Sequence, residues 1–75
     1  MASIIRSAAD LGTYIRTRRK ALGYSQVRVA SLCGTGTRFI SDLENGKETV
    51  ELGKAIVVAT ALGIDLKGEY RGVDQ

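Results

Sequence analysis

The sequence predicts an all-α domain of four helices, followed by a short C-terminal β-strand. A chain of 75 residues is too short for two hydrophobic cores, so residues 1–75 are expected to form one domain. Apolar residues recur at helical spacing in four segments, and each segment ends close to a glycine. After the fourth segment, apolar and polar residues alternate with the period of two that is typical of a strand. We therefore expect a helical core over residues 7–63 and a strand over residues 64–71.

Helix packing and subunit association are the expected sources of stability. The chain contains one cysteine and no histidine, which excludes a disulfide within the chain and a structural zinc site. Small domains without such links usually depend on idealised helix packing or on a partner subunit. No metal and no cofactor are therefore expected.

The first helix is expected to span Ala8–Ala21. Asp10 follows Ser7 by three residues, which resembles a capping box with Asp in place of Glu. Gly23 comes just after the last apolar residue of the pattern and is expected to end the helix in the left-handed conformation. The expected buried stripe consists of Leu11, Ile15 and Leu22.

Two shorter helices are expected next, separated by a turn that contains two glycines. Ser25 is the candidate N-cap of a helix from Gln26 to about Leu32, which Gly34 ends. The third helix is expected over Thr37–Glu44 and closes at Asn45-Gly46. Their expected inner faces consist of Val29, Ala30 and Cys33 in one, and Phe39, Ile40 and Leu43 in the other.

The fourth helix, from about Leu52 to Leu62, is apolar over more than half of its circumference. Its expected inner face consists of Leu52, Ala55, Ile56, Ala59 and Leu62. Val57, Val58 and Ala61 are additional apolar positions, and one small core does not cover so wide a face. Something outside this core is therefore expected to cover them.

The alternating C-terminal segment needs a second edge, because a lone strand is not stable. That edge is either the same segment of another subunit or the stretch Ser3–Arg6, and both alternatives favour a homodimer. The expected dimer interface consists of Val57, Val58, Ala61, Ile64, Leu66 and Tyr70.

Charge divides the chain into two parts. Residues 1–47 hold eight basic and three acidic residues, a net charge of +5, whereas residues 48–75 hold three basic and five acidic residues, a net charge of −2. A basic half favours a polyanionic partner, either nucleic acid or an acidic membrane surface, and basic residues kept only for solubility are the alternative. The longest apolar stretch, Ala55–Ala59, is far shorter than the roughly 20 residues of a membrane span. Without a secretory pattern at the N-terminus, a cytoplasmic location is expected.

Two helices joined by a short glycine-containing turn, within a basic helical domain, form a helix-turn-helix pattern. In such a unit the second helix enters the major groove of double-stranded DNA with its N-terminal residues at the base edges. The outward residues of the third helix are therefore the candidate base readers, namely Thr37, Arg38 and Ser41. Arg38 is the strongest candidate, because a guanidinium can pair bidentately with guanine.

Phosphate contacts are expected from residues that flank the reading helix. The candidates are Gln26, Asn45, Lys47 and Arg28. Asn45 is equally well interpreted as a turn residue, and Arg28 as part of a solvated face. Asp42 can accept from cytosine N4, but a solvated or arginine-paired carboxylate is favoured because a negative charge near phosphates is costly.

Residues Leu11–Leu66 resemble the XRE or Cro/C1 family of phage-type repressors. The resemblance is carried by R-R-K-A-L-G-Y-S-Q-x-x-x-A, by the glycine turn and by F-I-S-D-L-E-N-G-K. A closer resemblance to HipB-type antitoxins rests on I-R-S-A-A-D-L-G before and within the first helix and on A-L-G-I-D-L near the C-terminus. The chain departs from the family at Gly36, where a capping Ser or Thr is usual, so a phosphate contact from that hydroxyl is lost.

This resemblance implies a lambda-repressor-like four-helix domain, a dimer with a β-lid between subunits, and an inverted-repeat operator. It also implies a structural ion pair between Arg19 and Glu44, and a HipA-like kinase toxin as a partner. The leading hypothesis is thus a homodimeric repressor that serves as the antitoxin of such a pair and regulates its own operon. The alternative is a phage-type repressor or a restriction-modification controller without a toxin partner. An enzyme is not expected, because no residue pattern supplies a general acid and base.

Overall fold

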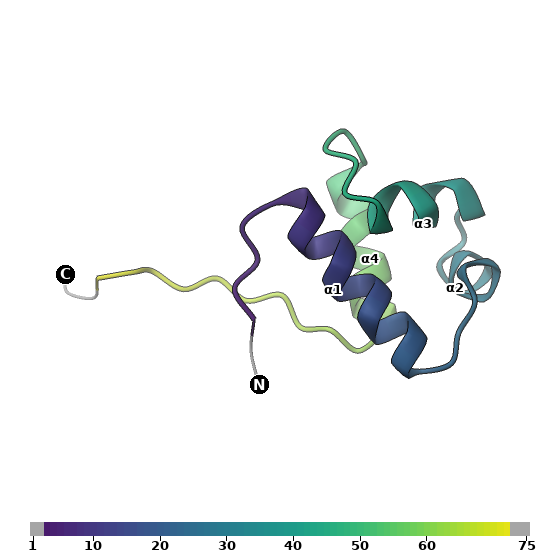
Figure 1. Cartoon of the computed structure of the whole chain (residues 1–75), viewed down its shortest axis with the longest axis horizontal. Coiled ribbons are helices and arrows are strands. Elements are labelled where there is room, and N and C mark those ends of the chain that lie inside the picture. The colour runs from purple at the N-terminus through teal and green to yellow at the C-terminus, as the bar shows by residue number, and fades with distance from the viewer. Residues whose placement is uncertain (1–2, 73–75) are drawn as a thin grey trace.

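The computed structural model describes residues 3–72, and four helices form its body (Figure 1). They are α1 (Ala8–Ala21), α2 (Gln26–Cys33), α3 (Thr37–Glu44) and α4 (Leu52–Ala61). α3 packs against both α1 and α2, and α2 also packs against α4. The C-terminal segment leaves this body as an extended chain on the side away from α2 (Figure 1). No helix in the described part of the chain is long and apolar enough to cross a membrane.

The predicted helix boundaries are confirmed to within one residue, because local capping signals fix them. The Ser7 hydroxyl accepts a hydrogen bond from the Asp10 amide at 3.0 Å, and the Ser25 hydroxyl accepts one from the Arg28 amide at 3.0 Å. The Asp10 carboxylate accepts a hydrogen bond from the Arg6 amide. In a regular capping box it would accept from the amide of the N-cap residue, which here is Ser7. Glycines with positive φ follow the four helices, namely Gly23, Gly34, Gly46 and Gly63.

The core draws side chains from every helix and from two residues beyond α4, Leu62 and Ile64. Its buried members are Ile15, Val29, Ala30, Ile40, Leu43, Ala55, Val58, Ala59, Leu62 and Ile64. Leu11, Phe39 and Cys33 pack at its edge as partly buried residues. The expected inner faces of α2 and α3 are thus confirmed, but Leu22 of the first stripe is an exposed hydrophobic residue.

The inward face of α4 is confirmed at Ala55, Ala59 and Leu62 and differs from the prediction at two other positions. Leu52 is 67% exposed and Ile56 is 43% exposed, although both were expected inside, whereas Val58 is 0% exposed. The helix carries two overlapping apolar stripes, and periodicity alone does not decide which one packs inward. The stripe that contains Ala55 and Ala59 packs inward. Its small side chains allow α4 to lie close to α2, the helix against which it packs. Val58 therefore belongs to the core of the single chain, which corrects its assignment to a dimer interface.

The predicted C-terminal strand is absent from the single chain. Residues 64–70 are extended, but residues 3–72 contain no strand, and residues 3–6 do not pair with this segment. Ile64 is buried in the core, which also corrects its assignment to the dimer interface, while Leu66 and Tyr70 lie exposed. A strand requires a neighbour with matching backbone groups, and within residues 3–72 no segment provides one.

Candidate nucleic-acid interface

The turn between α2 and α3 is closed by backbone hydrogen bonds. Gly34 has φ of 67° and its amide donates to the Ser31 carbonyl, while the Thr35 amide donates to the Ala30 carbonyl at 3.0 Å. Gly36 then caps the start of α3 in an extended conformation, without any side-chain hydrogen bond. A Cβ atom on Gly36 would meet no other atom within 4 Å, so the space in front of α3 is open at this residue.

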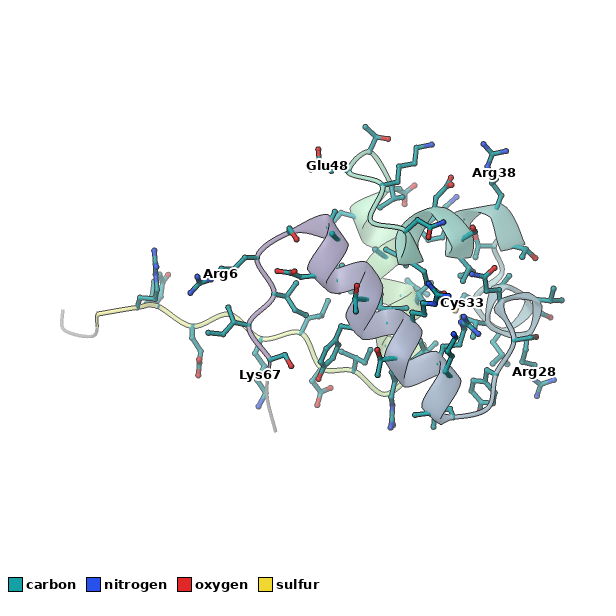
Figure 2. The ribbon with its side chains drawn as sticks, viewed as in Figure 1. Arg6, Arg28, Cys33, Arg38, Glu48 and Lys67 are labelled. Carbon is teal, nitrogen blue, oxygen red and sulfur yellow. The ribbon has the colours of Figure 1, made fainter. Side chains whose placement is uncertain are left out.

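The outward side of α3 presents two of the candidate base readers to solvent. Thr37 is exposed, and the Arg38 side chain is 89% exposed and points away from the helical body (Figure 2). Ser41 is half-buried one turn later. Ile40 and Leu43 occupy the opposite side of the helix and are buried. The reading face that helical periodicity predicts is therefore available, although the base contacts themselves stay a prediction.

The candidate phosphate contacts are distributed unequally around this face. Asn45 and Lys47 lie at the end of α3, where the Asn45 side-chain amide donates to the Ser41 hydroxyl at 3.4 Å. Arg28 points outward from α2, on a different part of the surface from Arg38 (Figure 2). Gln26 is partly committed to the fold, because its side-chain amide donates to a Glu44 carboxylate oxygen at 3.2 Å. Gln26 thus donates to a buried carboxylate, whereas the partners of Asn45 and Lys47, Ser41 and Asp42, lie nearer the surface of α3.

A buried ion pair supports this face from beneath. Arg19 of α1 is 8% exposed and Glu44 of α3 is 6% exposed. The Arg19 Nε and Nη2 atoms donate to the two Glu44 oxygens at 2.5 and 2.9 Å, and Nη1 donates to the Tyr24 carbonyl at 2.8 Å. Every nitrogen of this guanidinium therefore has a partner, and the pair that the resemblance implied is present.

The surroundings of this pair hold both groups in the charged state. Burial alone would raise the pKa of Glu44, but hydrogen bonds from Arg19 and Gln26, together with the charges of Arg19 and Arg16, outweigh burial and lower it. The hydrogen bond to Glu44 raises the pKa of Arg19, and burial opposes that effect. α1, the start of α2 and the end of α3 are thus joined by one charged network.

Two structural contacts near this face were not found from the sequence. A Cβ atom on Gly12 of α1 would lie 2.4 Å from the Leu43 carbonyl oxygen, so the backbones of α1 and α3 touch there. Arg18 of α1 donates through Nε to the Leu62 carbonyl at 2.8 Å and so supplies a partner for a carbonyl at the end of α4. The glycine in the middle of a helix was the one available signal for the first contact.

Comparison with known proteins places these elements in a family. A family model described as Helix-turn-helix matches residues 15–68, which include α2, the turn and α3. The chain belongs to the XRE-type helix-turn-helix family. A curated relative, the HTH-type transcriptional regulator y4mF of Sinorhizobium fredii (strain NBRC 101917 / NGR234), is 41% identical over 66 residues, which cover 88% of this chain and 87% of the relative. This is not an enzyme family, in agreement with the expectation from the residue content.

Solved structures with the same fold include several HipB complexes. HipB with an O2 20mer matches this XRE-type chain with a TM-score of 0.86 at 20% identity, over 95% of this chain and 99% of HipB. The complex of HipA, HipB, O2 and O3 matches with a TM-score of 0.85 at 20% identity, over 93% and 99% of the two chains. A structure named MDT Protein matches with a TM-score of 0.85 at 20% identity, over 93% and 99%. These likenesses show a common fold.

Proposed function

We propose that this XRE-type protein is a sequence-specific DNA-binding transcriptional repressor that acts as a homodimer on an inverted-repeat operator. The observation that carries the proposal is the solvent-exposed first turn of α3, where Arg38 projects from a helix that packs against both α1 and α2. The relative that is 41% identical is described as an HTH-type transcriptional regulator, which supports the same function.

In the proposed complex, α3 lies in the major groove and α2 crosses the backbone. The two terminal nitrogens of Arg38 pair with O6 and N7 of a guanine, and Thr37 and Ser41 contact neighbouring base edges. Lys47 and Asn45 bind phosphates on one side of the helix, and Arg28 binds phosphate nearer to α2. Because phosphate neutralisation releases counterions, the affinity falls steeply as the salt concentration rises.

Replacing Arg38 and Lys47 separately should produce two different defects. Arg38→Ala is expected to weaken discrimination at one operator position by about 1–3 kcal/mol, because a bidentate base contact is lost. Lys47→Ala is expected to weaken binding to all duplexes alike and to reduce the salt dependence, because a phosphate contact is lost. Fluorescence anisotropy with the duplex upstream of the protein's own reading frame, and with single-base variants of it, measures both effects.

Lys67→Ala provides the matched control, because Lys67 is exposed on the C-terminal segment, away from α3 (Figure 2). It removes one positive charge without touching the reading face. Equal effects of Arg38→Ala and Lys47→Ala on discrimination would contradict these roles. A wild-type protein without any preference for its own upstream duplex over a shuffled duplex would refute the proposed function.

The proposed dimer rests on apolar side chains that the single chain leaves exposed, namely Val57, Ala61, Leu66 and Tyr70. Leu66→Asp is expected to convert the dimer into a monomer in sedimentation-velocity experiments, because Leu66 is 46% exposed in the single chain and takes no part in its buried core. Lys67→Asp is the control, since neighbouring residues of an extended segment point to opposite sides. An unchanged dimer mass for Leu66→Asp would argue against an interface at this segment.

We further propose an antitoxin role, in which this protein also binds and neutralises a HipA-like kinase. The support is the pair of exposed apolar side chains Leu52 and Ile56 on α4, which the proposed dimer interface does not include, together with the acidic C-terminal part of the chain. The fold is shared with HipB, whose complex with HipA has been solved. Co-purification with the product of an adjacent kinase-like reading frame tests this role, and its failure would leave the DNA-binding proposal intact. A phage-type repressor or a restriction-modification controller would use the same DNA contacts without that partner.

A further inference from the structure

Asp42 lies between two cations that the proposed function assigns to DNA. One of its carboxylate oxygens, Oδ1, is 3.8 Å from the Nε atom of Arg38. The other, Oδ2, is 3.5 Å from the Nζ atom of Lys47. The Asp42 side chain is 28% exposed, so the carboxylate sits lower in the surface than either cation. One acidic side chain therefore holds a candidate base reader and a candidate phosphate contact at the same time.

The backbone at the end of α3 fixes this arrangement. Arg38 precedes Asp42 by one helical turn, which places the two side chains on the same side of the helix. Lys47 returns to Asp42 because its amide donates to the Asp42 carbonyl at 3.0 Å, while the Gly46 amide donates to the Leu43 carbonyl at 3.1 Å. This is the double hydrogen bond of a Schellman motif, and Gly46 supplies the φ of 78° that it requires.

The contact atoms indicate what Asp42 does to Arg38. Asp42 faces Nε, so both terminal nitrogens of the guanidinium stay available. These two nitrogens form the planar fork that pairs with guanine O6 and N7. Asp42 can therefore keep its contact with Arg38 while Arg38 reads a base. It cannot keep that contact when the guanidinium swings away to follow a phosphate.

We propose that Asp42 is a specificity-determining positioning residue, an inference that rests on the proposed DNA-binding function. On a matching duplex, Asp42 orients Arg38 toward its base and the ion pair persists. On a non-matching duplex, binding depends on phosphates, and Arg38 and Lys47 must leave Asp42 to reach them. The carboxylate therefore withholds positive charge from non-matching DNA, which widens the difference in affinity between correct and incorrect sites.

Asp42→Asn tests this role in the full-length chain, with Glu48→Gln as the matched control. Glu48 is an exposed carboxylate in the loop after α3, and no hydrogen bond or ion pair joins it to the other described residues (Figure 2). Relative to Glu48→Gln, Asp42→Asn should raise affinity for a shuffled duplex about threefold, the size expected for released surface ion pairs. Affinity for the protein's own upstream duplex should not rise, so the discrimination ratio should fall about threefold.

A second measurement separates positioning from a loss of structure. In an Arg38→Gln, Lys47→Gln background, Asp42→Asn should no longer alter the ratio, because the cations that it positions are gone. Thermal melting of each variant establishes that it is folded, and Asp42→Ser provides a second uncharged side chain if Asp42→Asn melts early.

Three results would overturn the inference. If Asp42→Asn raised the affinity for both duplexes equally, Asp42 would act only by electrostatic repulsion of phosphates. An affinity for the shuffled duplex that does not rise, with a fall for the upstream duplex alone, would mean that Asp42 withholds no positive charge from non-matching DNA. A change in the ratio that persists without Arg38 and Lys47 would mean that Asp42 acts independently of them. A wild-type protein that prefers neither duplex would instead refute the proposed function itself.

Discussion

Replacing Gly12 by alanine is expected to destabilise the domain by about 3 kcal/mol, which a domain of this size barely tolerates. The added Cβ would lie 2.4 Å from the Leu43 carbonyl oxygen and 2.7 Å from the Glu44 carbonyl oxygen. Both obstacles are backbone atoms at the end of α3, so no side-chain rotation relieves the overlap. α1 would have to move away from α3, which would also separate Arg19 from Glu44.

The measurement is urea denaturation followed by circular dichroism, with Gly53→Ala as the control. Gly53 lies in the first turn of α4, where a Cβ would meet only a Glu51 side-chain oxygen at an ordinary 3.5 Å. Alanine there should leave stability unchanged or raise it by up to about 1 kcal/mol, because alanine favours helix more than glycine does. A Gly12→Ala variant as stable as the wild type would show that α1 and α3 can separate freely.

Replacing Arg19 by methionine is expected to cost about 3–5 kcal/mol, because it leaves the Glu44 carboxylate buried without its charged partner. The same change also frees the Tyr24 carbonyl, to which Arg19 donates. Lys20→Met is the control, since Lys20 is exposed on the same helix and does not act on Glu44, and it should change stability by no more than about 0.5 kcal/mol. The free energy of unfolding at pH 7 measures both variants, and equal stabilities would contradict the structural role of the pair.

The pH dependence of stability should change sign between the wild type and Arg19→Met. In the wild type the pKa of Glu44 lies below its unfolded value, so its contribution is complete above the unfolded pKa, about 4.3, and is lost as the pH falls through the folded pKa. Without Arg19, burial dominates and raises that pKa, so protonation should restore stability as the pH falls from 7 toward 4. Unfolding curves at several pH values distinguish the two slopes, and parallel slopes would contradict this account.

The variants Gly12→Ala and Arg19→Met would also lose DNA binding, although neither residue lies on the reading face. Both act by shifting α3 relative to α1, which carries Arg38 and the Asp42 carboxylate away from their positions. Binding assays on any variant of this region therefore need a stability measurement beside them. Lys47→Ala and Asp42→Asn, by contrast, change exposed or half-buried groups and should keep the fold.

The helices were predictable from sequence because their ends depend on neighbouring residues. Ser7, Ser25 and the glycines after each helix act within four residues of the boundary that they set. The inward face of α4 depended on its orientation against α2, and the C-terminal strand depended on a partner. Neither of these determinants lies within the local sequence.

The candidate site was predictable only in part for the same reason. Helical periodicity places Arg38 outward without any tertiary information, and the structure agrees. The hydrogen bond from Gln26 to Glu44 joins residues 18 positions apart, and no local pattern indicates it. The Arg19–Glu44 pair was anticipated from family resemblance and not from spacing, because residues of two different helices meet there only in the folded chain.

Ile64 divides the chain into two parts whose amino-acid sequences are under different structural constraints. Within residues 3–72 it is the last buried residue, and residues 65–71 all lie on the surface. Substitutions in this segment leave the core and the reading helix untouched, while they alter the surface that a second copy would meet. In the proposed dimer, changes confined to a few C-terminal residues would therefore keep this regulator from pairing with related ones, while the operator preference proposed for α3 would stay the same.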